Sequence, residues 1–338
     1  MQKDHNNNTL LLQEQISILV SERCFALFLC IARRTISCPQ EGVSAFMLTG
    51  SLVALITPMD RSGSVDWQAL ERLIDYHIQS GTNALVVAGT TGESVTLDEH
   101  ELFSLFDKVL EYSAGRIPVI AGCGSNNTAH AKKIAKQIRL MGISAGLSVT
   151  PYYNKPTQEG LYQHYAAIGE YSGLSQILYN VPGRTGCDLQ PETVARLAGN
   201  FGICGIKEAT GKIARASELR ALCGENFALY SGDDATAREF IEAGGNGVIS
   251  VTANIAAKEM SRMCAHALAG EELFAKEIDD CLQPLHRELF IESNPIPVKW
   301  AAARMGLINY ADLRLPLTLL SSGAQAIVEG ALVKAELI

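Results

Sequence analysis

Three side chains that could carry out carbonyl chemistry lie at or just after the ends of apolar, strand-like segments: Lys207, Tyr179 and Arg184. Lys207 follows the apolar residues 203–206, and a lysine at the edge of an apolar core loses hydration, which lowers its pKa. A neutral amine can attack a ketone to form an imine, which draws electrons from the neighbouring carbon. Position alone leaves a second interpretation open, in which Lys207 pairs with Glu208 or another acid.

Tyr179 and Arg184 would complete such a site in different ways. A phenol can act as general acid or base, and a guanidinium offers two parallel donors to a carboxylate. Each also has an ordinary structural interpretation, as a barrel-lining aromatic for Tyr179 and as a surface ion pair for Arg184. Thr90 and Thr91, which glycines flank, could donate hydrogen bonds to a second carboxylate or could simply form a tight turn.

Metal and disulfide chemistry find little support in the sequence. The nine cysteines are odd in number and form no Cys-x-x-Cys pair or Cys/His cluster. This pattern argues against a disulfide framework or a zinc site, and it predicts a reduced, cytoplasmic protein. Asp233 and Asp234 have no second carboxylate cluster to join, so we interpret them as helix-capping residues and expect no metal ion.

The composition bounds the kinds of partner that the protein can have. The 338 residues carry a formal net charge of -8, and a nucleic-acid or anionic-membrane binder would need a basic face instead. Hydrophobic residues make up 47% and charged residues 19% of the chain, as is usual for a globular protein with a large core. We therefore expect no nucleic acid and no membrane among its partners.

Strand-like and helical segments alternate from Met47 onward, and the reactive residues follow the strands. The apolar runs are continuous rather than alternating, which is typical of strands covered on both faces. Eight strands are predicted, at about 52–56, 84–88, 117–121, 146–149, 176–179, 202–206, 228–230 and 247–250. Helical segments separate them, and Asp66 and Asp98 stand where two of these helices are expected to begin. Eight such units predict an α/β fold with a closed (β/α)8 TIM barrel, whose strand ends meet at one mouth. An open doubly wound sheet is the alternative, but no GxGxxG turn follows the first strand.

The chain divides into three predicted parts. Residues 1–46 lack the strand–helix rhythm, and their apolar run at 24–32 is too short to span a bilayer, so we interpret them as a poorly ordered or non-native extension. Residues 47–268 form the catalytic barrel. Residues 269–338, where strand signals stop, form a small helical appendage.

Six motifs in one register resemble the dihydrodipicolinate synthase family, within the superfamily of pyruvate-dependent Schiff-base lyases. The motifs are GTTGES (89–94), TPYYNKP (150–156), YNVPGRTG (179–186), GIKEATG (205–211), SGDD (231–234) and NPIPVKW (294–300). The resemblance runs from Met47 to the C-terminus. It implies the condensation of pyruvate with L-aspartate 4-semialdehyde in lysine and diaminopimelate synthesis, with no cofactor and commonly in a homotetramer of two tight dimers.

The resemblance also assigns roles to matching residues. Lys207 matches the lysine that forms the Schiff base with pyruvate, and Tyr179 matches the tyrosine that moves protons, with Thr90 and Tyr153 as its relay. Tyr153 reaches in from a neighbouring subunit. The substrate-binding positions implied are Thr91 and Ile249 for pyruvate, Gly232 close by, and Arg184 for the carboxylate of the semialdehyde.

A regulatory pocket is implied as well, and here the sequence departs from the family pattern. Ser94, Asn126 and Tyr152 match the interface pocket at which lysine-inhibited members bind lysine. Where such members tend to carry a glutamate and histidines, this chain has His130, Glu99 and Leu102. We therefore expect weak or absent inhibition by L-lysine.

Two other functions remain to be weighed. A pyruvate lyase acting on N-acetylneuraminate or a sugar acid would share Lys207 and Tyr179, but would favour hydroxyl-binding residues in place of Arg184. A catalytically inactive barrel kept as a binding module would have no need for the complete set of reactive residues.

Overall fold

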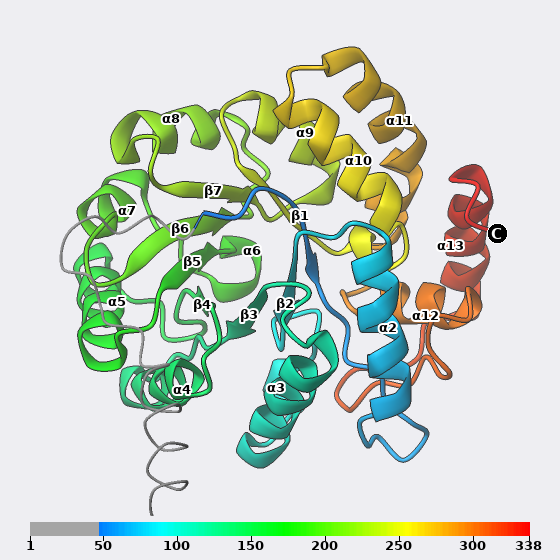
Figure 1. Cartoon of the computed structure of the whole chain (residues 1–338), viewed down its shortest axis with the longest axis horizontal. Coiled ribbons are helices and arrows are strands. Elements are labelled where there is room, and N and C mark those ends of the chain that lie inside the picture. The colour runs from blue at the N-terminus through cyan, green and yellow to red at the C-terminus, as the bar shows by residue number, and fades with distance from the viewer. Residues whose placement is uncertain (1–46) are drawn as a thin grey trace, which may run out of the picture. The chain divides into compact units, whose positions relative to one another are not determined.

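The computed structural model describes residues 47–338, and the prediction for residues 1–46 lies outside them. Eight parallel strands close into a barrel in sequence order, with the last strand pairing with the first (Figure 1). They are β1 (Gly50–Ala54), β2 (Ala84–Val87), β3 (Val119–Gly122), β4 (Ala145–Val149), β5 (Gln176–Asn180), β6 (Ile203–Glu208), β7 (Ala228–Ser231) and β8 (Gly247–Ser250). The predicted (β/α)8 barrel is confirmed.

An outer ring of helices covers the barrel (Figure 1). It consists of α2 (Trp67–Gln79), α3 (Glu99–Ser113), α4 (Thr128–Leu140), α5 (Gln158–Ser172), α7 (Pro191–Leu197), α8 (Ala214–Cys223), α9 (Ala237–Glu242) and α10 (Ala257–Leu268). The loops at the strand ends also contain short helices: η1 (Ser94–Thr96), α6 (Pro182–Thr185), η2 (Asp234–Thr236) and η3 (Thr252–Asn254). Asp66 and Asp98 cap α2 and α3 by accepting from backbone N–H groups, as their sequence positions predict.

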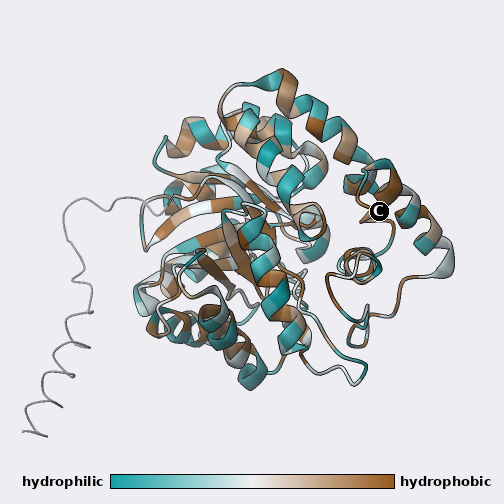
Figure 2. Cartoon of the chain, turned by 45° about the vertical axis from the view of Figure 1, so that its right-hand side comes forward, coloured by the Kyte–Doolittle hydropathy of each residue, from teal (hydrophilic) through white to brown (hydrophobic). Residues whose placement is uncertain are grey.

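Both faces of the strands are buried, which explains their continuous apolar sequences. Leu52 packs inside the barrel with Val86 and Ile249, whereas its neighbour Val53 packs outward against helical residues such as Leu70. The strands accordingly appear largely hydrophobic in Figure 2, while the surrounding helices alternate between hydrophobic and hydrophilic residues. The barrel is a packed core, and functional side chains must therefore lie at its mouth.

Three further helices follow the barrel: α11 (Glu272–Glu288), α12 (Ile296–Arg304) and α13 (Ser322–Lys334). They share one hydrophobic cluster with the barrel's outer face, in which Val328 and Leu332 of α13 join Val298 of α12 and Leu285 of α11. The predicted C-terminal helices are thus present. In residues 47–338, no helix combines the length and apolarity that crossing a membrane requires.

Candidate active site

Lys207 and Tyr179 lie opposite each other on neighbouring strands. The pairing of β5 with β6 shifts by one residue after Gln176, so that Ile177 pairs with Gly205 and Tyr179 with Lys207. Without this irregularity Tyr179 would face Ile206, which illustrates how a bulge can redirect a side chain beside a functional site. The Lys207 Nζ lies 4.5 Å from the centroid of the Tyr179 ring.

The Lys207 amine is buried and has no acidic partner. Lys207 is only 5% exposed, and its pKa falls to about 8, mainly because burial disfavours the charged amine. The charge of Asp234 opposes this fall, and the charge of Arg184 adds to it. Among residues 47–338 no carboxylate forms an ion pair with it. Glu208 instead accepts hydrogen bonds from Asn180 Nδ2 (3.0 Å) and the Thr210 backbone N–H (2.9 Å), so the rim ion pair with Glu208 is wrong.

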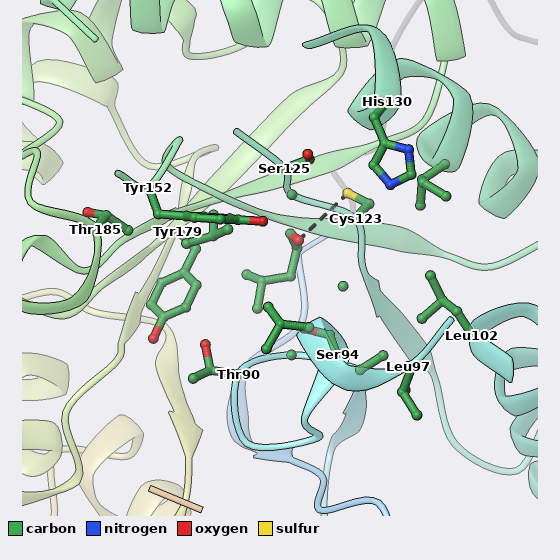
Figure 3. A pocket seen from close by; sticks show the side chains of 18 of the residues that line it. Thr90, Ser94, Leu97, Leu102, Cys123, Ser125, His130, Tyr152, Tyr179 and Thr185 are labelled. Atoms are coloured by element: carbon green, nitrogen blue, oxygen red, sulfur yellow. Dashed lines mark hydrogen bonds between the residues drawn. The ribbon is translucent and has the colours of Figure 1, made fainter. Parts of the chain in front are cut away.

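The Tyr179 hydroxyl faces Thr90 rather than a backbone partner. Figure 3 shows both hydroxyl groups turned toward the same space. Burial raises the pKa of Tyr179, and the charge of Arg184 and the hydrogen-bonding Thr90 side chain counteract part of this rise. Tyr230 makes the contrast clear, since its hydroxyl donates to the Leu48 carbonyl at 2.8 Å and so has the structural role considered for Tyr179.

Gly232, directly after β7, lies beside Lys207, and Ile249 lies in β8. A Cβ added to Gly232 would lie 3.0 Å from Lys207 Cε and 2.6 Å from Ala209 Cβ, so the glycine leaves room for the lysine chain. Ile249 is 1% exposed and belongs to the inner cluster of the barrel. Gly232 thus adjoins the reactive lysine, and Ile249 shares the inner hydrophobic cluster with Tyr179.

The loop after β2 carries the two threonines and is held by the C-terminal region. The Thr91 hydroxyl accepts a hydrogen bond from Asn294 Nδ2 at 3.0 Å. Two residues further on, Glu93 Oε1 lies 2.7 Å from Lys299 Nζ, and both side chains are fully buried. Asn294, Glu93 and Lys299 lie within the motifs GTTGES and NPIPVKW, but the sequence assigned them no role, because their partners lie about two hundred residues away.

Arg184 lies in the short helix α6 and reaches the same segment. Its Nη2 donates to the backbone carbonyl of Asn294 at 3.2 Å, and Arg184 pairs with no acid in the described part of the chain. The surface ion pair considered for this residue is therefore not formed, and the guanidinium keeps donors for a ligand.

A cavity of about 580 Å³ opens beside these residues. Figure 3 shows Thr90 and Tyr179 at one end, and Leu97, Leu102 and His130 at the other. Its lining includes Thr90, Ser94, Glu99, Leu102, Cys123, His130, Tyr152, Tyr179 and Arg184. Thr90 and Tyr179 thus share one cavity with Ser94 and Tyr152 of the predicted regulatory pocket. The residues that line this cavity do not include Lys207, Tyr153 or Asn126.

Tyr153 is the predicted site residue that lies apart from the others. It is 90% exposed and has a left-handed backbone conformation with φ of 73°. Its neighbour Tyr152 lines the cavity, and the Tyr152 carbonyl accepts from Asn126 Nδ2 at 3.3 Å. The side chain of Tyr153 therefore takes no part in the site of its own chain.

The interpretation of the acidic pair after β7 as helix caps is wrong. Neither Asp233 nor Asp234 caps the following helical turn through its side chain. Asp234 Oδ2 instead accepts from the backbone N–H groups of Val251 and Thr252, at 2.9 and 3.0 Å, and so ties the loop after β8 to β7. Within residues 47–338 no group of three or more His, Cys, Asp or Glu side chains could hold a metal ion.

Comparison with known proteins agrees with this geometry. A family model described as the Dihydrodipicolinate synthetase family matches residues 47–335. The chain belongs to this family. A relative named 4-hydroxy-tetrahydrodipicolinate synthase, from Psychromonas ingrahamii, is 57% identical over 292 residues, which cover 86% of this chain and all of the relative.

Two solved structures show the same fold. A chloride-inhibited dihydrodipicolinate synthase from Acinetobacter baumannii, complexed with pyruvate, has a TM-score of 0.84 and 51% identity over 86% of this chain and 99% of its own. A monomeric dihydrodipicolinate synthase variant has the same TM-score and 43% identity over 86% of this chain and 98% of its own.

Proposed function

We propose that this protein is a lyase, a 4-hydroxy-tetrahydrodipicolinate synthase, which condenses pyruvate with L-aspartate 4-semialdehyde. This reaction is the first committed step of lysine and diaminopimelate synthesis. The observation that carries the proposal is the Lys207 amine, buried without an acidic partner and 4.5 Å from the Tyr179 ring centroid. The names of the relatives and the pyruvate bound to the Acinetobacter enzyme support the choice of substrates.

The chemistry begins with the neutral amine of Lys207. Its nitrogen attacks the ketone carbon of pyruvate, and loss of water gives an imine. Removal of a proton from the adjacent methyl carbon then gives an enamine, which forms a carbon–carbon bond with the aldehyde carbon of the second substrate. Attack of that substrate's amine on the imine carbon closes the ring and releases Lys207. No cofactor is needed, because the imine itself accepts the electron pair.

The remaining residues bind the substrates and move protons. Tyr179 gives and takes protons through Thr90, toward which its hydroxyl points. Thr91 binds the carboxylate of pyruvate, with the backbone of Ile249 and the space left by Gly232 beside it. Arg184 holds the carboxylate of the semialdehyde through its guanidinium.

Tyr153 completes the relay from a second copy of the chain. Its 90% exposure and its position outside its own site support this part of the proposal. A homotetramer built from two such dimers is the assembly that we propose. The monomeric variant among the similar structures makes the oligomeric state a separate question from the fold. We also propose a cytoplasmic location, which the free cysteines in the described part of the chain support.

The proposed function is tested by supplying both substrates to the purified protein. We expect formation of 4-hydroxy-tetrahydrodipicolinate from pyruvate and L-aspartate 4-semialdehyde, followed by coupled reduction or mass spectrometry. N-acetylneuraminate should not be cleaved. Turnover of N-acetylneuraminate without turnover of the semialdehyde would assign the protein to the sugar-acid lyases instead.

A further inference from the structure

We propose that Asn294 is a positioning residue that directs the Thr91 hydroxyl hydrogen toward the carboxylate of the keto acid. This inference rests on the proposed function and extends it to a residue outside the barrel. Asn294 lies just before α12 and is 6% exposed. Asn294 contacts both residues that are proposed to bind carboxylates. Its side-chain Nδ2 donates to Thr91, and its backbone carbonyl accepts from Arg184.

The direction of the hydrogen bond carries the argument. Asn294 Nδ2 donates to Thr91 Oγ1 at 3.0 Å, so the threonine oxygen acts as acceptor. The Thr91 hydroxyl hydrogen must then point elsewhere, since a hydroxyl donates only one hydrogen. Among residues 47–338 this hydrogen has no acceptor, although Thr91 is only 3% exposed. The hydroxyl is thus prepared to donate to an incoming anion.

The other end of the Asn294 amide argues against a purely stabilising role. Its Oδ1 is buried and has no hydrogen-bond partner in the described part of the chain. A buried polar atom without a partner costs stability, and such atoms in native structures call for an explanation. Asn254, in contrast, is a buried asparagine in which both ends of the amide are paired. Its Nδ2 donates to the Ala54 and Val251 carbonyls, and its Oδ1 accepts from the Ile56 N–H.

The surrounding contacts fix the distance between Asn294 and Thr91. The buried ion pair between Lys299 and Glu93 joins α12 to the loop that carries Thr91. The backbone N–H of Arg314 donates to the other Glu93 oxygen at 3.1 Å. The C-terminal region is therefore attached to this loop at two points, which keep Asn294 within hydrogen-bonding distance of Thr91.

A double-mutant cycle separates positioning from general stabilisation. We expect Asn294→Ala and Thr91→Val each to raise the KM for pyruvate by roughly tenfold, since hydrogen bonds to charged groups are worth about this factor or more. The KM of the double variant should equal that of Thr91→Val alone, because Asn294 acts through the hydroxyl that is already missing. The kcat at saturating pyruvate should change much less. Asn254→Ala is the matched control, and its effects should multiply with those of Thr91→Val.

A second variant keeps the test decisive if Asn294→Ala folds poorly. Asn294→Asp preserves the shape of the side chain, but the new carboxylate would accept the Thr91 hydroxyl hydrogen. Because that hydrogen is then no longer free to bind pyruvate, the KM for pyruvate should rise by more than tenfold. An unchanged KM in Asn294→Asp, or multiplying effects in the Asn294→Ala and Thr91→Val cycle, would overturn the inference. Failure of the wild-type protein to form a borohydride-trapped adduct with pyruvate would instead overturn the proposed function.

Discussion

The two halves of the site are positioned by different means. Lys207 and Tyr179 lie on adjacent strands, and the register of β5 against β6 places them opposite each other. Thr91 and Arg184 lie after β2 and β5, and each forms a hydrogen bond with Asn294 from the segment before α12. The proposed reacting pair is thus built into the barrel, whereas the proposed carboxylate-binding pair is contacted by a residue outside it.

The C-terminal helices accordingly help to hold the loop that carries Thr91. Parallel strands fix their neighbours through evenly spaced backbone hydrogen bonds, but a loop needs a second element to fix it. The fully buried pair of Glu93 and Lys299 supplies that element for the loop after β2. Changes in the strands should therefore affect chemistry, and changes in the C-terminal segment should affect stability and substrate binding.

The largest effect is expected for the strand-borne proton donor. Tyr179→Phe keeps the ring over Lys207 but removes the hydroxyl, so kcat should fall roughly 10²- to 10³-fold. Tyr230→Phe is the control, because its hydroxyl donates only to the Leu48 carbonyl. It should lower the free energy of unfolding by about 1 kcal/mol with little change in kcat. Steady-state kinetics and denaturant titration check both, and equal activity losses would contradict the assignment.

The buried ion pair between Glu93 and Lys299 should contribute most to the stability of the loop that carries Thr91. Lys299→Met leaves the Glu93 carboxylate buried without its partner, which should lower the free energy of unfolding by about 3–5 kcal/mol. The matched control is Lys276→Met, whose 2.6 Å pair with Asp280 is exposed and should contribute about 0.5 kcal/mol or less. Urea unfolding of the two variants makes the comparison, and similar losses would show that the buried pair has no special role.

The pH dependence of imine formation tests the environment of the reacting lysine. Because burial lowers the pKa of Lys207 to about 8, the neutral amine is scarce below this pH and predominant above it. The rate of imine formation with pyruvate should rise about tenfold per pH unit below 8 and then level off. Rapid-mixing measurements over this range check it. A rate that rises steadily toward pH 10.5, the ordinary value for lysine, would exclude a desolvated amine.

The smallest response is expected from the far end of the cavity. His130 lines this end where lysine-inhibited members tend to carry an acid, so half-maximal inhibition by L-lysine should need more than about 1 mM. His130→Glu should increase the sensitivity by adding a partner for the ligand's ammonium group. Titration of L-lysine in a coupled assay measures both, and strong sub-millimolar inhibition of the wild-type protein would refute the prediction.

The sequence predicted what depends on local patterns. Continuous apolar runs indicated strands buried on both faces, and Asp66 and Asp98 marked helix starts that the structure confirms. The order of the strands around the barrel followed from the repeat of strand and helix. The reactive residues could be placed at the mouth because they follow the strand ends.

The sequence did not predict contacts between distant segments. Asn294 and Thr91 are 203 residues apart, and Lys299 and Glu93 are 206 apart, so no periodicity or spacing links them. The register shift that brings Lys207 opposite Tyr179 depends on a single extra residue in β6, which leaves no mark in a run of apolar residues. Asp234 was misinterpreted for the same reason, since its backbone partners at 251 and 252 belong to the next strand–loop unit.

The central claim, that Lys207 forms an imine with pyruvate, is tested most directly by borohydride trapping and peptide mass analysis. We predict one irreversible adduct, with the mass of reduced pyruvate, on the peptide that contains Lys207. Lys207→Ala should form no adduct, and Lys212→Ala, which removes an exposed lysine five residues away, should label like the wild type. An adduct on any other lysine, or none in the wild-type protein, would contradict the proposed mechanism.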